Sequence, residues 1–432
     1  MSIARSITRP SVRSITSGVT SRIGDAPTLD LGFGAQGGFP PGLINYSRAS
    51  PRTLRRAVDG LMVTLAPNQF ATDHDVNGDP LGLPLEGSRT NLQIHSEALD
   101  NVVWTGVRTS TIIADQALGP DGVLNLEEII EDSGTGTHYH RYNFVSGIGF
   151  NDVVTASYFV RANTRTFATI RCSNLAQTNP VAMFNLNTGV VEADIVAGFV
   201  DKGIEDWGGG LYRIWVSVDQ GAVGTGAVFF GLGLAPSATI DSYIGDGSSS
   251  ILGGFCQVEL GAFPSSYIKT EGTAATREAD SVIITDLSWL NENQGTFLIN
   301  GVLIDYIPST TDRIMALQND AGTQTQDYYW AGGTPANVNF YDGVSHILST
   351  GAFTPGASFS FAAAYAVDDI VAIRDGGTPV ASFDTGGALP SGFTKLVIGN
   401  SGNGSRSMYG TIERIRYWPR RLPNSDLIFL TR

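Results

Sequence analysis

In the stretch DVVTASYFVRA, residues 152–162, the pattern of side chains repeats with a period of two residues. A repeat of two residues puts successive side chains on opposite faces of an extended chain and indicates a β-strand. Further strand-like segments follow at intervals of roughly ten residues, separated by turns rich in Asn, Gly and Ser. They are RTFATIR (165–171), PVAMFNL (180–186), LYRIWVSVD (211–219), AVFFGLGL (227–234) and FCQVEL (255–260). This spacing predicts an antiparallel β-sandwich or jelly roll.

A second series of strand-like segments begins after residues 272–280 and predicts a second sandwich. The final segment, NSDLIFLTR (424–432), places polar residues before Leu427, Ile428 and Leu430, which predicts one short closing helix with a polar N-cap. The second series includes SVIITDLSWL (281–290), GTFLINGVLIDYI (295–307), ANVNFYDG (336–343) and SMYGTIERIRYWPRRL (407–422). The expected fold is therefore all-β, with two tandem antiparallel β-sandwich domains preceded by an irregular N-terminal attachment arm.

The composition agrees with this fold class and excludes some functions. The chain has 432 residues, more than one hydrophobic core normally supports, and its 52 glycines and 16% charged residues are typical of short strands joined by tight turns. A net charge of -14 argues against nucleic-acid binding, which needs a basic surface. No apolar stretch reaches the roughly 20 residues that cross a bilayer, so no membrane insertion is expected. Cys172 and Cys256 lie in strand-like runs and are expected to be buried thiols rather than a disulfide.

Residues 1–24 contain four arginines and no acidic residue. Their Ser/Thr/Arg composition cannot bury enough apolar surface to order the segment alone, which predicts an arm. A transit peptide has a similar composition. We favour a docking arm that binds an acidic surface of a particle through Arg5, Arg9, Arg13 and Arg22. Gly32, Gly34 and Gly37 satisfy a GxGxxG pattern, but Pro40 and Pro41 follow where a dinucleotide site needs a helix, so residues up to 43 are interpreted as a Gly/Pro linker.

The stretch DHDVNGDPLGLPLEGSRTNL, residues 73–92, opens like an oxygen-lined calcium loop, with Asp73, Asp75 and Asn77 before Gly78. In the EF-hand frame, Gly78 takes the sixth position and a bidentate Glu belongs at residue 84, which is Pro84. The alternative, which we favour, is a series of turns in which Asp and Asn side chains bind their own backbone. No cofactor is predicted, and calcium at this stretch is kept as the alternative.

Two blocks resemble a pattern found in fibre and spike proteins of tailed bacteriophages and of phage-derived gene transfer agents. The first runs through LEGSRTNL (85–92) to Trp104, and the second is GGFCQVELGAFPSSYIKTEGTAATREADSV (253–282). The resemblance implies a carbohydrate-binding jelly roll at 86–278, entered through a connecting segment at 44–85. GTIERIRYWPRRLPNSDLIFL (410–430) is similar to the end of concanavalin-like sandwiches, which implies a concanavalin- or laminin-G-like domain at 279–432.

The sequence contains no GxSxG, HExxH or P-loop pattern, and no enzyme is predicted. A glycosidase needs two carboxylates about 5–10 Å apart, an arrangement that this sequence with 41 acidic residues neither shows nor excludes. His138 and His140 have the spacing of two ligands on one strand face, but no third histidine lies near them. They are interpreted as a polar or sugar-contacting pair, with a metal as the alternative.

Glycan binding suits this composition better, because a sugar ring needs an aromatic platform flanked by polar side chains. Trp104, Trp215, Trp289 and Trp418 lie in strand-like or apolar contexts and are assigned to the core. Three other stretches combine rings, polar groups and turns. The candidate contacts are His138, Tyr139, His140, Arg141, Tyr142, Trp207, Gln326, Asp327, Tyr328, Tyr329 and Trp330.

The predicted function is that of a virion fibre or spike protein, on the head or tail of a phage-type particle, that binds host-surface polysaccharide. Its expected partners are capsid, portal or baseplate proteins and host glycan, and the resemblance implies synthesis in the bacterial cytoplasm and assembly as a homo-oligomer, with a trimer favoured. The alternatives are a capsid decoration protein that binds no glycan and a polysaccharide depolymerase.

Overall fold

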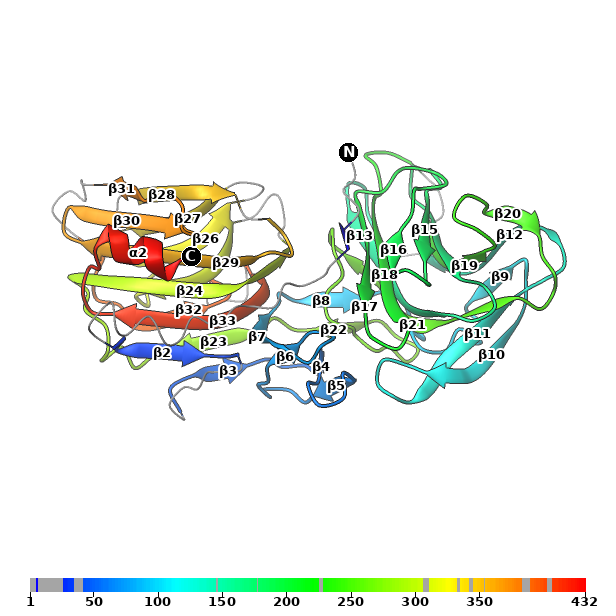
Figure 1. The fold of residues 1–432 in the computed structure, drawn as a ribbon, viewed down its shortest axis with the longest axis horizontal. Helices are drawn as coiled ribbons and strands as arrows, with labels where there is room; N and C mark the ends of the chain where they lie inside the picture. The colour runs from blue at the N-terminus through cyan, green and yellow to red at the C-terminus, as the bar shows by residue number, and fades with distance from the viewer. Residues whose placement is uncertain are drawn as a thin grey trace. The chain divides into compact units, whose positions relative to one another are not determined.

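The computed structural model describes residues 5–6, 26–34, 42–144, 147–176, 178–224, 228–305, 311–331, 335–341, 345–352, 354–382, 389–401 and 406–432. The chain forms two compact units (Figure 1). Unit 1 comprises Met1–Thr8, Arg52–Thr64 and Arg89–Arg277, and unit 2 comprises Arg9–Pro51, Leu65–Ser88 and Glu278–Arg432. Each unit is built from antiparallel sheets, which confirms the all-β prediction.

Unit 1 contains two seven-stranded sheets. Sheet 1A has the strand order β1-β17-β18-β13-β21-β11-β10, and sheet 1B has the order β16-β15-β14-β19-β12-β20, with β9 also paired to β12. Sheet 1A consists of β1 (Arg5–Ser6), β10 (Thr109–Leu118), β11 (Leu124–Glu131), β13 (Val153–Ala162), β17 (Asp201–Asp206), β18 (Leu211–Asp219) and β21 (Ser250–Leu260). Sheet 1B consists of β9 (Thr105–Val107), β12 (Thr135–Phe144), β14 (Phe167–Ser173), β15 (Val181–Asn185), β16 (Val190–Val191), β19 (Val228–Ala235) and β20 (Ser242–Ile244).

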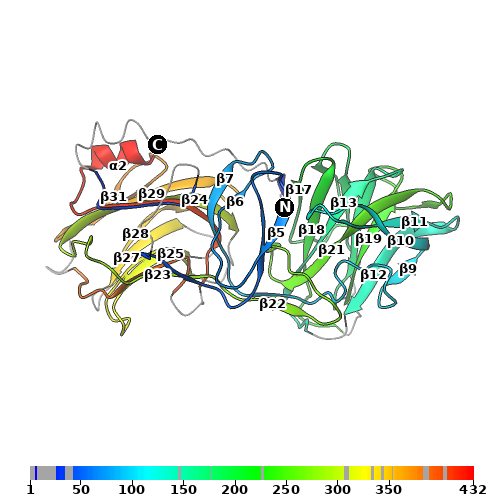
Figure 2. The same cartoon turned by 90° about the horizontal axis from the view of Figure 1, so that it is seen from below.

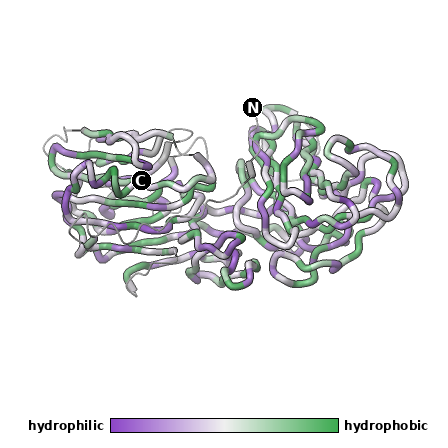
Figure 3. Tube along the Cα trace, in the orientation of Figure 1, coloured by the Kyte–Doolittle hydropathy of each residue, from purple (hydrophilic) through white to green (hydrophobic). Residues whose placement is uncertain are grey.

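The core of unit 1 lies between these sheets. Val154, Ala156, Tyr158 and Val160 of β13 all point into it, as the alternation of residues 152–162 predicts. Ile170, Phe230 and their neighbours fill it from sheet 1B, and both cysteines are buried free thiols, as predicted. Figure 3 shows the apolar residues concentrated along the strands of each unit.

Two short segments close unit 1. β8 (Arg89–Asn91) pairs with β22 (Ala275–Arg277), so the two blocks that carry the fibre resemblance lie side by side. Arg89 Nε lies 3.8 Å from Glu259 Oε2 of β21, and the hydroxyls of Thr90 and Thr276 are 2.8 Å apart. A hairpin of β4 (Arg52–Arg55) and β5 (Met62–Leu65) completes the unit, with Met62 packed against Phe159 and Phe255.

Unit 2 is a sandwich of an eight-stranded and a seven-stranded sheet. Sheet 2A has the order β31-β30-β29-β24-β33-β7-β6, with β2 also paired to β33, and sheet 2B has the order β28-β27-β26-β25-β32-β23-β3. Sheet 2A consists of β2 (Leu29–Gly32), β6 (Asp73–His74), β7 (Pro80–Leu85), β24 (Gln294–Asp305), β29 (Ser358–Ala366), β30 (Asp369–Arg374), β31 (Val380–Ser382) and β33 (Tyr409–Trp418). Sheet 2B consists of β3 (Asn45–Ser47), β23 (Ser281–Ile284), β25 (Thr311–Gln318), β26 (Thr325–Ala331), β27 (Pro335–Tyr341), β28 (Ser345–Ala352) and β32 (Lys395–Ile398).

The two sheets of unit 2 are not covered in the same way. Their inner faces share one core that contains Phe297, Tyr328 and Phe361. The outer face of sheet 2A carries a second apolar layer, on which α2 (Asn424–Leu430) packs with Leu427 (Figure 2). The closing helix is therefore confirmed, although its N-cap is Pro423 and no side chain caps it.

The connecting segment predicted at 44–85 is not a separate element. β3, β6 and β7 of this segment are strands of the two sheets of unit 2, and β7 pairs with β33. These strands have two to six residues, too few to display a period. The partners of β3 and β7 lie more than 200 residues later in the chain, and β6 pairs with β7. The main segment of unit 1, Arg89–Arg277, thus interrupts the chain of unit 2.

Three of the four predicted core tryptophans, Trp104, Trp215 and Trp418, are buried, and Trp289 is half-buried. Within the part of the chain that is described, the structure contains no helix long and apolar enough to span a membrane.

Candidate functional site

The histidines of β12 face the core of unit 1 rather than solvent. His138 and His140 are 1% and 6% exposed, and their rings bind backbone carbonyls: His138 Nδ1 lies 2.6 Å from the Arg108 oxygen and His140 Nε2 lies 2.9 Å from the Leu99 oxygen. Burial lowers the pKa of His140, so its ring is neutral near pH 7. A sugar-contacting role for these two residues is therefore wrong, because the sandwich interior covers both rings.

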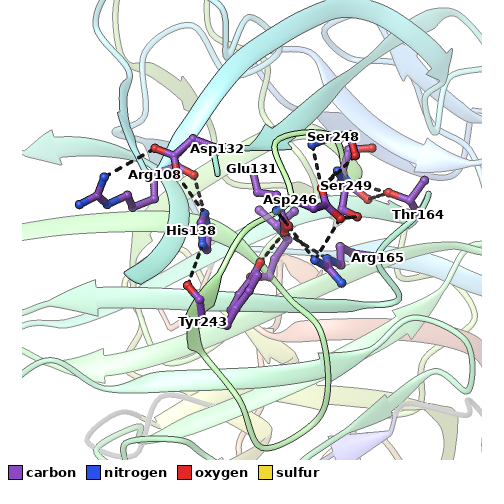
Figure 4. A network of polar contacts seen from close by, with 12 residues as sticks. Arg108, Glu131, Asp132, His138, Thr164, Arg165, Tyr243, Asp246, Ser248 and Ser249 are labelled. Atoms are coloured by element: carbon purple, nitrogen blue, oxygen red, sulfur yellow. Dashed lines mark hydrogen bonds and ion pairs between the residues drawn. The ribbon is translucent and has the colours of Figure 1, made fainter. Parts of the chain in front are cut away.

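His138 adjoins a polar network at one end of unit 1 (Figure 4). The carboxylate of Glu131 is buried and accepts hydrogen bonds from the Arg165 guanidinium at 2.6 and 3.1 Å and from the Tyr243 hydroxyl at 2.6 Å. Burial acts to raise the pKa of Glu131, but these hydrogen bonds outweigh it and lower the pKa below its ordinary value. Asp246 ties down the adjacent turn by accepting from the Ser248 and Ser249 backbone amides. The network is internally satisfied and orders the loops.

The other predicted residues of β12, which are Tyr139, Arg141 and Tyr142, differ in their exposure to solvent. Tyr139 is buried beneath Arg171 on the outer face of sheet 1B, which excludes it as a platform. Arg141 lies over the Phe229 ring at 4.7 Å, and Tyr142 is half-buried and packs against the core. Only Arg141 and Tyr142 of this stretch remain accessible to a ligand.

Trp207, predicted as a platform beside a turn, is only partly available. The Arg55 guanidinium lies over its ring at 4.0 Å, and the Phe159 ring packs against it edge-on at 5.0 Å. The turn itself is as expected, because Gly208, Gly209 and Gly210 all have positive φ. Arg55 covers the ring face that a sugar would need.

In unit 2, β26 divides the predicted residues between two faces. Gln326 and Tyr328 point into the core and are 1% and 0% exposed, so the structure contradicts a ligand contact for both. Asp327 and Tyr329 lie on the opposite, outer face of sheet 2B, but only Tyr329 is accessible there. Asp327 is 4% exposed, so the structure contradicts a direct ligand contact for it as well. The side chain of Trp330 lies outside the described residues.

The outer face of sheet 2B combines rings with polar groups. Register places Arg313 of β25 beside Tyr329, and Tyr329 beside Asn337 of β27. The next row joins Asp327 to Asn339, and the row beyond it joins Thr325 to Tyr341. Neighbouring side chains on one sheet face are about 5 Å apart, so these residues form one surface. We call Arg313, Asp327, Tyr329, Asn337, Asn339 and Tyr341 the sheet 2B face.

The charged side chains of the sheet 2B face form an ion pair and a hydrogen bond with their neighbours. Arg313 Nη2 lies 2.8 Å from Asp327 Oδ2, which also accepts from the Thr325 hydroxyl at 3.2 Å. Burial raises the pKa of Asp327, and Arg313 offsets only part of that effect. Burial also raises the pKa of Tyr329, which keeps its hydroxyl protonated as a hydrogen-bond donor. The oxygens Asp327 Oδ1 and Asn339 Oδ1 have no hydrogen-bond partner among the described residues.

Unit 1 contains a different feature, a depression with a volume of about 310 Å³. Glu127 of β11 is 3% exposed, and one of its oxygens accepts from the Asp100 backbone amide at 2.9 Å. Burial, together with the nearby Asp100 carboxylate, raises the pKa of Glu127 to about 8. Lys269 bridges Glu97 and Glu271 at 2.9 and 3.2 Å. The remaining lining residues are His95, Ala98, Ala114, Asp115, Asn125 and Thr270.

The loop at residues 73–79 folds as a series of turns. Asp75 Oδ1 accepts hydrogen bonds from the Asn77 and Asp79 amides at 2.8 and 2.9 Å, and Gly78 has a φ of 80°. The turn interpretation is confirmed. Across the described ranges, no group of three or more His, Cys, Asp and Glu side chains could hold a metal. Calcium binding by Asp73, Asp75 and Asn77 stays a hypothesis.

Three residues of the attachment arm, Arg9, Arg13 and Arg22, lie outside the described residues, as does the side chain of Arg5. The backbone of Arg5 pairs in parallel with Gly203 of β17. The docking hypothesis for the arm therefore stays a prediction.

Sequence reasoning missed Arg313, Asn337, Asn339 and Tyr341 of the sheet 2B face. A signal for three of them was present, because ANVNFYDG alternates Asn337, Asn339 and Tyr341 with apolar residues at period two. Arg313 had no such signal, since its place beside Tyr329 depends on strand register and a bulge in β25.

No family model matches the chain, and no curated protein matches it. Among solved structures, a carbohydrate-binding module of the Ruminococcus gnavus IT-sialidase, bound to α2,3-sialyllactose, has 16% identity and a TM-score of 0.30 over 33% of this chain and 84% of its own. The Trypanosoma rangeli sialidase has 11% identity and a TM-score of 0.29 over 71% and 60% of the two chains. Domains LG4-5 of the mouse laminin α1 chain have 11% identity and a TM-score of 0.23 over 66% and 85%. Similarities at this level assign no family.

Proposed function

We propose that this protein binds polysaccharide through the sheet 2B face. The observation that carries the proposal is the register that puts Tyr329 and Tyr341 on one outer face with the half-buried Asn339 and Arg313, whereas Asn337 of the same face is buried. An aromatic ring takes the apolar face of a sugar, while amide and guanidinium groups bind its hydroxyls.

The spacing of the two rings suits a polymer. Thr325 lies four residues before Tyr329 on β26 and pairs with Tyr341 on the neighbouring strand β27. At 3.3 Å per residue along the strand and one strand spacing across the sheet, the two tyrosines lie about 14 Å apart. Both side chains are half-buried, which leaves each ring anchored but accessible. Two platforms at this distance would contact different units of one chain.

Glycan-array binding of the full-length protein tests the proposal. Tyr329→Ala and Tyr341→Ala should each weaken binding to the captured glycan about tenfold, because a ring contact contributes on the order of 1 kcal/mol or more. Phe150→Ala is the matched control, since Phe150 is an exposed ring of unit 1. Full binding by both tyrosine variants would contradict the site, and Tyr142→Ala would then test the β12 stretch.

The setting we propose is a fibre or spike of a phage-type particle, with residues 1–24 as the attachment arm and a homo-oligomer, favoured as a trimer, as the assembly. The two blocks of the fibre resemblance support it. Deletion of residues 1–24 should leave a glycan-binding protein that no longer enters particles, whereas normal incorporation of the truncated chain would contradict the arm.

A polysaccharide-cleaving activity is the second candidate, and Glu127 favours it. A carboxyl group with a pKa of about 8 carries a proton at pH 7 and has the chemistry of a general acid. Incubation with polysaccharide followed by size analysis would show shortening, and Glu127→Gln should abolish it. Unchanged polymer length with the unaltered protein would exclude cleavage of that polymer.

A further inference from the structure

One cation beside the sheet 2B face has no partner. The side chain of Arg406 is exposed, and among the described residues it forms no ion pair. Its carbonyl accepts a hydrogen bond from the Arg313 amide at 2.9 Å, and Ser407 forms a parallel bridge with Arg313. Since Arg313 pairs with Tyr329, Ser407 continues the row that crosses the sheet through these residues, and Arg406 directly precedes it in the chain.

The backbone at Arg406 is strained. Its φ of 54° lies in the left-handed region, which residues with a Cβ rarely adopt. The flanking contacts hold this conformation, because both the Arg406 carbonyl and the Met408 amide are bonded, the latter to Gly399 at 2.7 Å. Strain of this kind, held in place by its surroundings, is concentrated at functional sites.

The charge of Arg406 acts on the sheet 2B face. Its positive charge acts to lower the pKa of Asp327 and of Tyr329, against the larger effect of burial, which raises both. Arg313 is already paired with Asp327 at 2.8 Å, which leaves Arg406 as the charge available to a ligand. The chain carries a net charge of -14, so most of its surface repels anions.

We propose that Arg406 and Tyr329 form a subsite for an acidic sugar, so that the protein binds polysaccharides that carry carboxylate groups. The guanidinium would bind the carboxylate by charge-assisted hydrogen bonds, while the ring would take the apolar face of the sugar. This inference rests on the proposed function and adds the class of glycan.

Affinity electrophoresis of the full-length protein in gels that contain polygalacturonate or neutral dextran tests the subsite. Arg406→Gly removes the guanidinium and relieves the backbone strain, so the variant should fold. It should bind polygalacturonate at least about tenfold more weakly, the usual effect of losing one charge-assisted hydrogen bond, and its retardation by dextran should not change. Tyr329→Ala should weaken retardation by any polysaccharide that the protein binds.

Arg56→Gln is the matched control, because it removes one exposed positive charge in unit 1, where Arg56 contacts only the i+3 residue Asp59. Equal retardation of Arg406→Gly and Arg56→Gln by polygalacturonate would overturn the subsite and leave glycan binding intact. Absence of retardation of the unaltered protein in either gel, with no hit on the glycan array, would overturn the proposed function as well.

Discussion

Asn91 and Ile268, 177 residues apart in the chain, are joined by a buried hydrogen bond of 2.8 Å from Asn91 Nδ2 to the Ile268 carbonyl. The same nitrogen donates to the Cys256 carbonyl at 3.1 Å, and Asn91 Oδ1 accepts from the Gln93 and Val258 amides, each at 3.0 Å. The Asn91 side chain thus forms hydrogen bonds with four backbone groups and links the start of the main segment of unit 1 to its end.

Asn91→Ala should destabilise unit 1 severely. The substitution leaves four buried backbone groups without their partner, and each costs on the order of 1–3 kcal/mol, so a loss of at least about 3 kcal/mol is expected. Urea unfolding followed by fluorescence measures it. Asn143→Ala is the control, because Asn143 is exposed on β12, and equal midpoints for the two variants would contradict the role of Asn91.

The ion pair between Arg48 and Asp280 should be essential to unit 2. Their side chains are 0% and 1% exposed and lie 3.3 Å apart, and Asp280 also accepts from the Glu86 amide at 2.9 Å. Asp280→Ala leaves a buried guanidinium uncompensated, which should cost about 3–5 kcal/mol in thermal or urea unfolding. Loss of the exposed Asp59 carboxylate, which faces Arg56, should leave the unfolding midpoint nearly unchanged, because solvent screens an exposed ion pair.

Gly203→Ala should destabilise sheet 1A, because a Cβ at this position would lie 2.0 Å from the Trp215 ring. The ring is 3% exposed and cannot move without disturbing its neighbours, so a loss of about 1–3 kcal/mol is expected. Tryptophan fluorescence during urea unfolding reports it. Gly209→Asn, at a turn position with open space and a φ of 59°, should be nearly neutral.

Glu127 should make stability fall as pH rises. Its pKa is about 8 in the folded chain, against an ordinary value of 4.5, so the folded state holds a proton that the unfolded state releases between these values. Stability from this group is complete below pH 4.5 and is lost up to about pH 8, with a slope of at most about 1.4 kcal/mol per pH unit. Urea unfolding at pH 5–8 measures the slope, and Glu127→Gln should flatten it. Parallel pH profiles for the two proteins would contradict the assignment.

The two thiols should be unreactive in the native protein. Cys172 and Cys256 are fully buried, and burial raises the pKa of both, so neither forms the reactive thiolate near pH 7. Ellman's reagent should label both thiols in urea and neither in buffer. Rapid labelling of the native protein would show that the core of unit 1 opens easily.

The strands were predictable where they are long and rich in apolar residues. β13 forms at Val153–Ala162 as expected from the period of two in its sequence, although its burial does not alternate: all side chains from Val154 to Val160 are buried, so both faces of the strand are covered. The same local reasoning failed for β3 and β7, whose few residues pair with strands in the second half of the chain, and for β6, which pairs with β7.

The candidate site was only partly predictable, as β26 shows. The sequence TQDYYWA identifies an aromatic strand with polar residues, but nothing local says which set faces solvent. Tyr328 is buried in the core of unit 2, whereas Tyr329 lies on the other face of the sheet, beside Arg313 and Asn337. Likewise, His138 and His140 share a face as predicted, but that face is the interior.

By itself, the sequence determined the all-β class, the division into two sandwiches, the short final helix and the turns around Asp75. These features depend on neighbouring residues, whose periodicity and backbone hydrogen bonding act locally. Only the tertiary structure decided which strand face is buried, that the segment Arg89–Arg277 of unit 1 interrupts the chain of unit 2, and that Arg313 pairs with Tyr329 on one side and bridges Ser407 on the other. Each of these depends on which distant strands pair and in what register, and pairing is selected by burial over the whole unit rather than by any one segment.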